Sequence, residues 1–531
     1  MKSVRANRSI KKEEEEYRFY FPKKMKFILF SLLIVLNLIL RIPFYPHEYG
    51  HDSFVVHILG NSISEFGYAR WWINPLSVFG LYPYSECSAV PFILSEISQT
   101  TGIDVEKVIL LFCIFLGLFT IFAGYILAGA IWDNDLFKFL VAFGLSTCPA
   151  ILNYLTWTIT MRAPFIALLP LFAYILLKAH NYKLRFALLA IILSVLLFAT
   201  HHLAYFLIPV FIGYLIVVIT FRVREHIKVS IAEKYITSVL LIGYLTMFAI
   251  PFITRRFIVG SRYEAIMELF FGNLPRYAGI MGVFALGGFT YLLFKNKKRF
   301  EEGCILLILM FLTPFLYIET YMKWFIPCFI FPLVGIGLIN ALKSDGRKRK
   351  FALLVVIIFL LLSVSFSAFY QHWRTKGGGI YLFKNYMEDS TYTAGLWIKE
   401  HISGTTISNN VLFGIRIFAT SGIPLMTGYY DTADLAYGLA DVKELKVVKK
   451  PISSDSFWFD GPYAKIGGYS SKIYWNDIMG NSYEYYESRY RSKFNFTHFI
   501  ERKGYHAKPL SYIHEKKNRV YDNGNINIWK L

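Results

Sequence analysis

Cysteine is scarce in this chain, and its five cysteines form no recognisable framework. Four of them lie in apolar runs and none follows residue 328, so neither a disulfide scaffold nor a cysteine-based metal site is predicted. The sequence also lacks a Walker A loop, a glycine-rich dinucleotide loop and a nucleophile elbow. It has no internal repeat and no long low-complexity tract. These absences leave no function to assign from a known motif. The apolar runs are therefore the most informative feature of the sequence.

Composition indicates a membrane protein. The 531 residues are 55% hydrophobic, and the mean hydropathy is +0.43. The net charge of +20 is also compatible with nucleic-acid binding. The basic residues, however, gather in short linkers between apolar runs, as membrane topology signals do. We therefore expect membrane lipids, and no nucleic acid, among the partners.

Apolar runs define the architecture, because a membrane-spanning helix needs about 20 mostly apolar residues. The first run is too long, in a chain with many such runs, to be a cleaved signal, so it is predicted to be a retained span. Residues His201 and His202 divide one long apolar stretch into two runs. The predicted fold is thus a polytopic α-helical membrane protein with about eleven spans, at 25–42, 108–132, 136–152, 163–178, 184–200, 203–221, 235–253, 277–294, 303–318, 324–342 and 350–370.

The basic linkers predict which side of the membrane each segment faces. Residues 1–24 are lysine-rich at 11–12 and 23–24, and every second linker after them is basic. By the positive-inside rule these segments are cytoplasmic. The predicted protein is a multi-pass protein of the cell membrane with a cytoplasmic N-terminal tail at 1–24, a membrane module at 25–370 and an extracellular C-terminal domain.

Residues 371–531 differ in character from the membrane module. Apolar runs become short, and Tyr, Asn, Gly and Ser become frequent. A helix is predicted at 391–401, a strand at 405–412 and a closing strand at 525–531. This region is expected to be an exported soluble α/β domain.

A second exported segment, residues 43–107, connects the first two spans and is too long for a simple turn. Its amphipathic stretch at 54–66 predicts helices that lie along the outer membrane interface. Trp71 and Trp72 fit an aromatic belt better than a sugar-stacking surface.

The segment Pro46–Ser53 directly follows the first span and holds four ionisable residues in six positions. Charged groups at such a place are costly and tend to be functional. Asp52 is the main candidate for a general base or a divalent-metal ligand, with Glu48 as a second catalytic carboxylate. His51 is a further candidate for a metal site with Asp52. The alternative is that Asp52 only caps the helix that follows.

Exported arginines are candidates for binding a phosphate group, because the guanidinium fork matches phosphate oxygens. The candidates are Arg162, Arg255, Arg256 and Arg262. Alternatively, Arg162 extends along the membrane surface, and the others belong to a solvated loop with acidic partners.

Other polar residues at outer corners are expected to line the same cavity as Asp52. They are His51, His201, His202, Glu319, Tyr321 and Lys323. Glu319 and Lys323, four positions apart, could instead simply pair with each other.

Three segments carry a resemblance to a known superfamily: residues 72–84, 394–400 and 521–529. With the acidic loop after the first span, they make the chain resemble GT-C integral membrane glycosyltransferases, especially archaeal members. That superfamily includes protein mannosyltransferases, aminoarabinose transferases and the catalytic subunit of oligosaccharyltransferase. Two departures from it stand out: there is no Trp-Trp-Asp-Tyr-Gly motif in the C-terminal domain and no exported Asp-x-Asp motif. The first argues against oligosaccharyltransferase activity, and the second leaves metal dependence open.

The resemblance implies an inverting glycosyltransferase that moves a sugar from a polyprenyl-phosphate-linked donor to an exported glycan or protein acceptor. It assigns Asp52 as the base and the outside arginines to the lipid phosphate. A divalent metal, Mg²⁺ or Mn²⁺, is an open expectation. The alternatives are a transporter or flippase of lipid-linked sugar, and a non-catalytic multi-pass surface protein.

Overall fold

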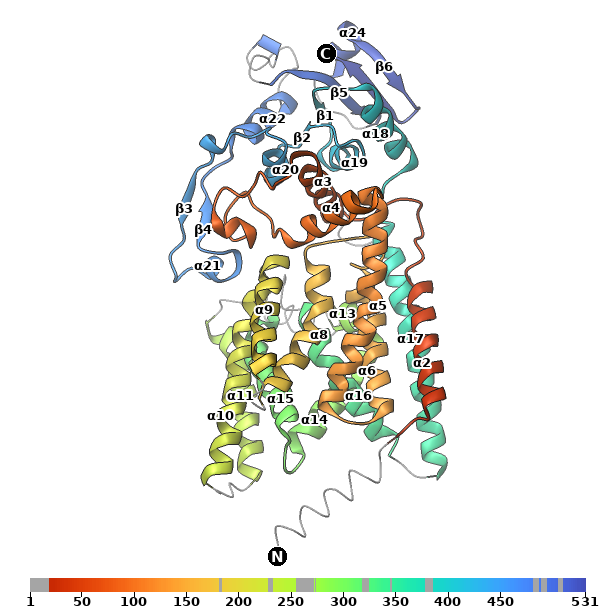
Figure 1. Ribbon diagram of the computed structural model, residues 1–531, viewed down its shortest axis with the longest axis vertical. Helices are drawn as coiled ribbons and strands as arrows, with labels where there is room; N and C mark the ends of the chain where they lie inside the picture. Colours follow the sequence, from red (N-terminus) through yellow and green to blue (C-terminus); the bar gives the residue numbers. More distant parts are fainter. Residues whose placement is uncertain are drawn as a thin grey trace, which may run out of the picture.

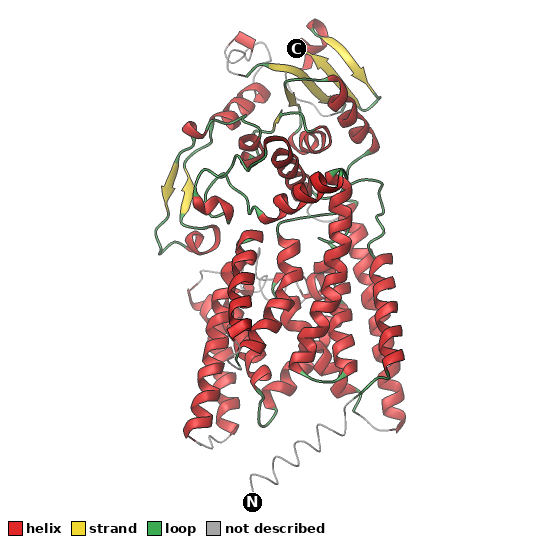
Figure 2. Cartoon of the chain, viewed as in Figure 1, coloured by secondary structure: helices red, strands yellow, loops and turns green. Residues whose placement is uncertain are grey.

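The computed structural model describes residues 19–180, 184–227, 233–254, 272, 274–317, 324–343, 346–377, 385–480, 487–488, 494–504 and 510–531. A helical bundle forms one end of the molecule, and a smaller part with strands covers the other end (Figures 1 and 2). The bundle helices are α2 (Lys23–Ile39), α5 (Val105–Ile131), α6 (Asp135–Thr147), α7 (Pro149–Leu152), α8 (Arg162–Ala179), α9 (Leu184–Thr200), α10 (Leu207–Ile227), α11 (Glu233–Thr254), α13 (Leu274–Ala278), α14 (Phe284–Phe294), α15 (Phe300–Leu312), α16 (Ile326–Ala341) and α17 (Gly346–Thr375). Short 3-10 helices flank some of them: η2 (His202–Phe206), η4 (Ile280–Val283) and η5 (Thr313–Tyr317).

Five of the described helical segments are long and apolar enough to cross a membrane: 105–131, 162–179, 202–223, 235–254 and 349–375. Each of the eleven predicted runs coincides with helical structure, but the count of eleven spans is not confirmed. The other helices are too short by this criterion, for local reasons. For example, α6 ends before Pro149, whose ring cannot continue the hydrogen-bond ladder of the helix.

Close approach between α14 and α16 depends on glycine. A Cβ atom added to Gly288 would lie 1.9 Å from the carbonyl oxygen of Leu333, and one added to Gly337 would lie 2.3 Å from that of Phe284. Small residues let the backbones of membrane helices pack this closely. The neighbouring Gly287 is exposed and has no atom within 4 Å of such a Cβ.

We predict that Gly288→Val destabilises the bundle, because α14 and α16 must separate to admit the side chain. Overpacking of this kind typically costs about 1–3 kcal/mol. Gly287→Val is the matched control, since it makes the same change in helix propensity but places the new side chain in open space. Melting temperatures of the two purified variants in detergent check this, and equal values would contradict it.

Segment 43–107 forms a layer between the bundle and the C-terminal part (Figure 1). Its helices are α3 (His51–Phe66) and α4 (Ala89–Thr101), with a 3-10 turn, η1 (Pro75–Val78). The prediction that these helices lie along the membrane interface is wrong for α3, which is buried against α4 and α19 (Val411–Ser421) of the C-terminal part. Trp71 is likewise fully buried, not an interfacial anchor.

The C-terminal part contains a five-stranded sheet in the order β2-β1-β5-β7-β6. Strands β1 (Thr405–Ser408), β2 (Leu425–Met426) and β5 (Phe496–Arg502) run parallel, and β6 (Asn518–Asp522) and β7 (Ile526–Lys530) are antiparallel to their neighbours. The predicted helix at 391–401 and the closing strand are confirmed as α18 (Asp389–His401) and β7. The remaining helices are α20 (Asp431–Ala436), η7 (Val442–Glu444), α21 (Asp455–Asp460), α22 (Ser470–Gly480) and α24 (Leu510–Lys516).

A two-stranded arm, formed by β3 (Val447–Lys449) and β4 (Tyr463–Lys465), lies beside segment 43–107. Helix α21 lies between its two strands in the sequence. Figure 1 shows this arm reaching down toward the upper end of α9. Helix α21 packs against η2 there. Consequently the C-terminal part, segment 43–107 and the ends of the bundle helices meet at one place.

Candidate functional site

The polar segment after α2 is held between two other parts of the chain. The N–H of Tyr49 donates to the carbonyl of Trp157 at 3.0 Å, and that of Gly50 donates to the carbonyl of Asn385 at 2.8 Å. Gly50 has a φ of +88°, and a Cβ atom here would lie 2.8 Å from a methyl group of Thr158. Glycine is therefore required where this segment turns into α3.

Asp52 lies in the first turn of α3 and faces Arg162, the first residue of α8. The carboxylate and guanidinium form an ion pair with an N–O distance of 2.8 Å. The alternative role of Asp52 as a helix cap is not observed, because Gly50 is the N-cap residue and no side chain caps the helix. The Asp52 side chain is 53% exposed, so such a pair contributes only about 0–1 kcal/mol to stability.

The ion pair lies in a polar cavity of about 220 Å³, which we call the first cavity. Segment 43–107, the start of α8, the α9–η2 corner and the C-terminal part all contribute to its wall. The lining residues are Asp52, Val55, Val56, Glu86, Cys87, Thr160, Met161, Arg162, His201, His202 and Tyr430. The structure thus brings Asp52, Arg162, His201 and His202 together, although up to 150 residues separate them in sequence.

Glu86 was not identified from the sequence, yet it is a second carboxylate of the first cavity. Burial and, to a smaller extent, the negative charge of Asp52 raise the pKa of Glu86 to about 7, although Arg162 opposes the shift. A carboxyl group that titrates near neutral pH is typical of functional sites. No motif around Glu86 signals this, because its surroundings arise only when segment 43–107 folds over the bundle.

Tyr430 brings the C-terminal part into the first cavity. It belongs to a turn that the buried carboxylate of Asp434 stabilises. This carboxylate accepts hydrogen bonds from the N–H and hydroxyl of Thr427 at 3.2 and 3.1 Å and from the N–H of Gly428 at 3.2 Å. The hydroxyl of Tyr469 donates to the same carboxylate. This network fixes the turn and thereby positions Tyr430.

Three other residues of the acidic segment lie outside the first cavity. Glu48 is buried and pairs with His57 at 2.7 Å, and burial raises its pKa. His51 is partly buried, and burial with the nearby charge of Arg416 lowers its pKa to about 4. His47 contacts Glu106 at 3.2 Å and stacks on Tyr392. The contacts of Glu48 and His47 are those of residues that anchor the segment.

Several predicted site residues lie outside the described residues. They are Arg255, Arg256, Arg262, Glu319, Tyr321 and Lys323.

Metal binding was tested on the side chains present. In the part of the chain that the structure describes, no three or more His, Cys, Asp or Glu residues are grouped so that they could hold a metal ion. Asp52 is instead engaged with a guanidinium group. The described residues therefore do not fit a metal centre.

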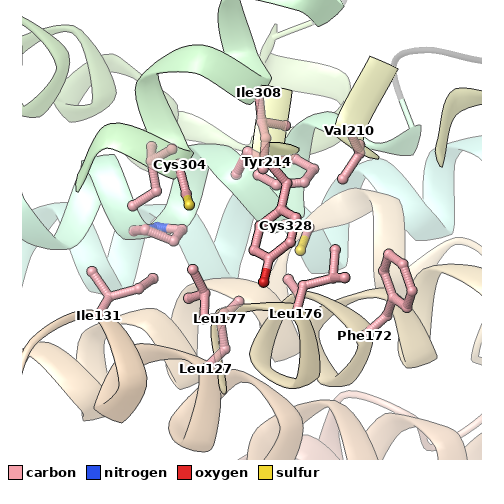
Figure 3. A pocket seen from close by; sticks show the side chains of 14 residues that line it. Leu127, Ile131, Phe172, Leu176, Leu177, Val210, Tyr214, Cys304, Ile308 and Cys328 are labelled. Atoms are coloured by element: carbon pink, nitrogen blue, oxygen red, sulfur yellow. The ribbon is translucent and has the colours of Figure 1, made fainter. Parts of the chain in front are cut away.

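A separate cavity inside the bundle is apolar and small (Figure 3). It lies between α5, α8, α10, α15 and α16, and its volume is only about 30 Å³. The side chains in Figure 3 are aliphatic or aromatic except for the thiols of Cys304 and Cys328 and the hydroxyl of Tyr214. It offers neither a charged group nor space for a substrate.

The arrangement of the helices and the sheet has counterparts among solved structures. No protein-family model matches the sequence, and no curated protein matches it. Among solved structures, the oligosaccharyltransferase of Archaeoglobus fulgidus with a tethered acceptor peptide is similar, with a TM-score of 0.59 and 11% identity over 91% of this chain and 69% of that one. The same protein in its complex with Zn and sulfate gives a TM-score of 0.54 and 12% identity, covering 89% and 68% of the two chains. Its apo form gives a TM-score of 0.56 and 11% identity, covering 91% and 70%.

These likenesses show the fold. The chain shares the fold of this archaeal protein, a helical bundle with a sheet-containing C-terminal part, in agreement with the fold class that the sequence resemblance predicted.

Proposed function

We propose that the chain is a GT-C glycosyltransferase that moves a sugar from a polyprenyl-phosphate-linked donor to an acceptor on the outer face of the membrane. The observation that carries the proposal is the Asp52–Arg162 pair inside a polar cavity at the mouth of the bundle. This ion pair adds little to the stability of the fold, and it shares its cavity with Glu86. A role in catalysis therefore explains the pair better than a role in folding does.

Arg162 is proposed to bind the phosphate of the donor. Its guanidinium also lies over the rings of Tyr154 and Trp324, at 5.5 and 5.7 Å from their centroids, which fixes the side chain in a defined orientation. When the donor binds, phosphate oxygens would replace Asp52 as the partner of the guanidinium fork. Arg162 then stabilises the negative charge that accumulates on the departing lipid phosphate.

Asp52 is proposed as the base. The acceptor nucleophile attacks the anomeric carbon from the face opposite the phosphate, its new bond to carbon forms as the bond from carbon to phosphate oxygen breaks, and its proton passes to the Asp52 carboxylate. The polyprenyl phosphate leaves with the bonding electron pair, and the configuration inverts. Glu86, which also lines this cavity, is proposed to orient the acceptor by accepting a hydrogen bond.

The direct test of this function uses purified protein in liposomes with a labelled polyprenyl-phosphate sugar and a membrane-derived glycan fraction as acceptor. We expect the label to move to the acceptor while polyprenyl phosphate is released in equal amount. Movement of intact donor between leaflets without cleavage would instead establish the transport alternative.

The ionisation of Glu86 predicts a pH dependence. With a pKa of about 7, Glu86 is ionised in about a tenth of molecules at pH 6 and in about nine tenths at pH 8. The groups around it that set this value are Asp52 and Arg162. We expect kcat/KM for the acceptor to rise through pH 7 in the wild type.

Glu86→Gln should remove this step and leave a flat profile between pH 6 and 8. Glutamine resembles the protonated carboxyl, which is the form that burial favours, so the variant should be at least as stable as the wild type at pH 7. A rise through pH 7 that persists in the variant would assign the ionisation to another group.

A further inference from the structure

A second cavity of about 200 Å³ adjoins the first one. It lies between Tyr84–Glu86 of segment 43–107 and residues 429–432 and Lys465 of the C-terminal part. Val55, Glu86 and Tyr430 line both cavities and so form the wall between them. A group bound in the second cavity would reach the first one beside Glu86.

Among the residues that the structure describes, two buried polar atoms of the residues lining the second cavity have no hydrogen-bond partner. They are the hydroxyl of Tyr84, a residue that is 5% exposed, and the Oδ1 atom of Asp431, a residue that is 9% exposed. The other carboxylate oxygen of Asp431 is already paired with Lys465 at 2.7 Å. Buried polar groups are normally hydrogen-bonded, so these two atoms need a polar partner, which water or a bound ligand in the cavity would supply.

The backbone around this cavity is fixed in advance. Tyr84 has a φ of +67°, which is unusual for a residue with a bulky side chain, and its ring packs against that of Tyr469. Across the cavity, Gly428 approaches Trp475 so closely that a Cβ atom would lie 2.5 Å from its side chain. Together with the Asp434 network, these contacts hold both walls in place without a ligand.

The chemistry of the lining selects the class of ligand. A phenol hydroxyl can donate or accept, and the free carboxylate oxygen can only accept, so the ligand must offer both donors and acceptors. Ser85 and Thr432 add hydroxyls, and three tyrosines add amphipathic rings. Val55 is the single aliphatic residue of the lining, which leaves no pocket for an apolar peptide side chain. The carboxylates of Glu86 and Asp431 disfavour an anion.

We propose that the second cavity binds the acceptor and that this acceptor is a carbohydrate. Its reacting hydroxyl enters the first cavity beside Glu86. This inference rests on the proposed glycosyltransferase function and narrows its acceptor from glycan or protein to glycan. Tyr84 and Asp431 are the residues that select it.

The binding test does not need the donor. Full-length protein in detergent is probed by saturation-transfer NMR with methyl glycosides of glucose, mannose, galactose and N-acetylglucosamine, and with an acetylated Asn-Val-Thr amide as the peptide probe. We expect signals from at least one glycoside. Tyr84→Phe, which removes only the unpartnered hydroxyl, and Asp431→Asn should each weaken binding about fivefold, the equivalent of one hydrogen bond.

Tyr82→Phe is the matched control, because Tyr82 lies in the same loop but lines neither cavity. Loss of the Tyr82 hydroxyl should leave glycoside binding unchanged. Tyr84→Phe should not lower the melting temperature, because the hydroxyl it removes has no hydrogen-bond partner among the described residues. Peptide signals that depend on Tyr84 and Asp431, in the absence of glycoside signals, would overturn the assignment. So would glycoside signals that neither variant changes.

Failure of this inference can be told apart from failure of the proposed function. If the chain transfers sugar but Tyr84→Phe leaves the acceptor KM unchanged, the acceptor assignment is wrong and the function stands. If glycosides bind as expected but no sugar leaves a polyprenyl-phosphate donor, the carbohydrate site stands and the function is wrong.

Discussion

Asp52→Asn is expected to lower kcat for sugar transfer by about 10²–10⁴-fold, the contribution of a positioned general base. Asparagine preserves the shape of the side chain and can still accept a hydrogen bond from Arg162, but it cannot take the acceptor's proton. Because the ion pair is exposed and worth little to folding, the melting temperature should change by only a degree or two.

Asp389→Asn is the control for this measurement. Asp389 has a largely exposed side chain, contacts His47 of the segment after α2 at 3.5 Å, and lines neither cavity. Its substitution should leave the rate within a factor of two. Transfer by Asp52→Asn at the wild-type rate would remove Asp52 from the mechanism. A larger loss in Glu86→Gln than in Asp52→Asn would move the role of base to Glu86.

Arg162→Ala is expected to reduce kcat/KM for the donor by about 10²–10³-fold, as removal of a fixed group that stabilises developing negative charge does. Arg162→Lys should recover only part of this loss, because lysine keeps the charge but lacks the planar fork that matches phosphate. Steady-state kinetics with varied donor and saturating acceptor measure both variants.

Arg374→Ala provides the comparison for Arg162. Arg374, on α17, donates to the hydroxyl of Tyr154 at 3.0 Å, the same ring over which Arg162 lies, but it does not line the first cavity. We expect a loss of less than tenfold. Equal losses in the two alanine variants would show a general electrostatic effect and contradict a specific phosphate site at Arg162.

The bundle could be predicted from the sequence because apolar runs and basic linkers are local signals. The number of spans could not, because helix ends depend on particular residues such as Pro149. In the C-terminal part, the strand predicted at 405–412 ends at Ser408. Asn410 accepts a hydrogen bond from the N–H of Phe413 and starts α19, a capping signal that the apolar run concealed.

For the site, the sequence placed Asp52 and Arg162 on the same outer face but could not pair them, since 110 residues separate them. It missed Glu86, Tyr84 and Tyr430, because their roles depend on the C-terminal part closing over segment 43–107. The same closure explains why α3, whose pattern resembles that of an interfacial helix, is buried. Amphipathicity indicates which face is covered, but not whether lipid or protein covers it.

The most direct test of the central claim is an experimental structure of the protein with a short-chain polyprenyl phosphate. The phosphate should lie in the first cavity, with its oxygens within hydrogen-bonding distance of the Arg162 guanidinium and the Asp52 carboxylate turned away from it. A phosphate bound elsewhere on the bundle, with the Asp52–Arg162 pair intact, would contradict the assignment of this cavity as the site of sugar transfer.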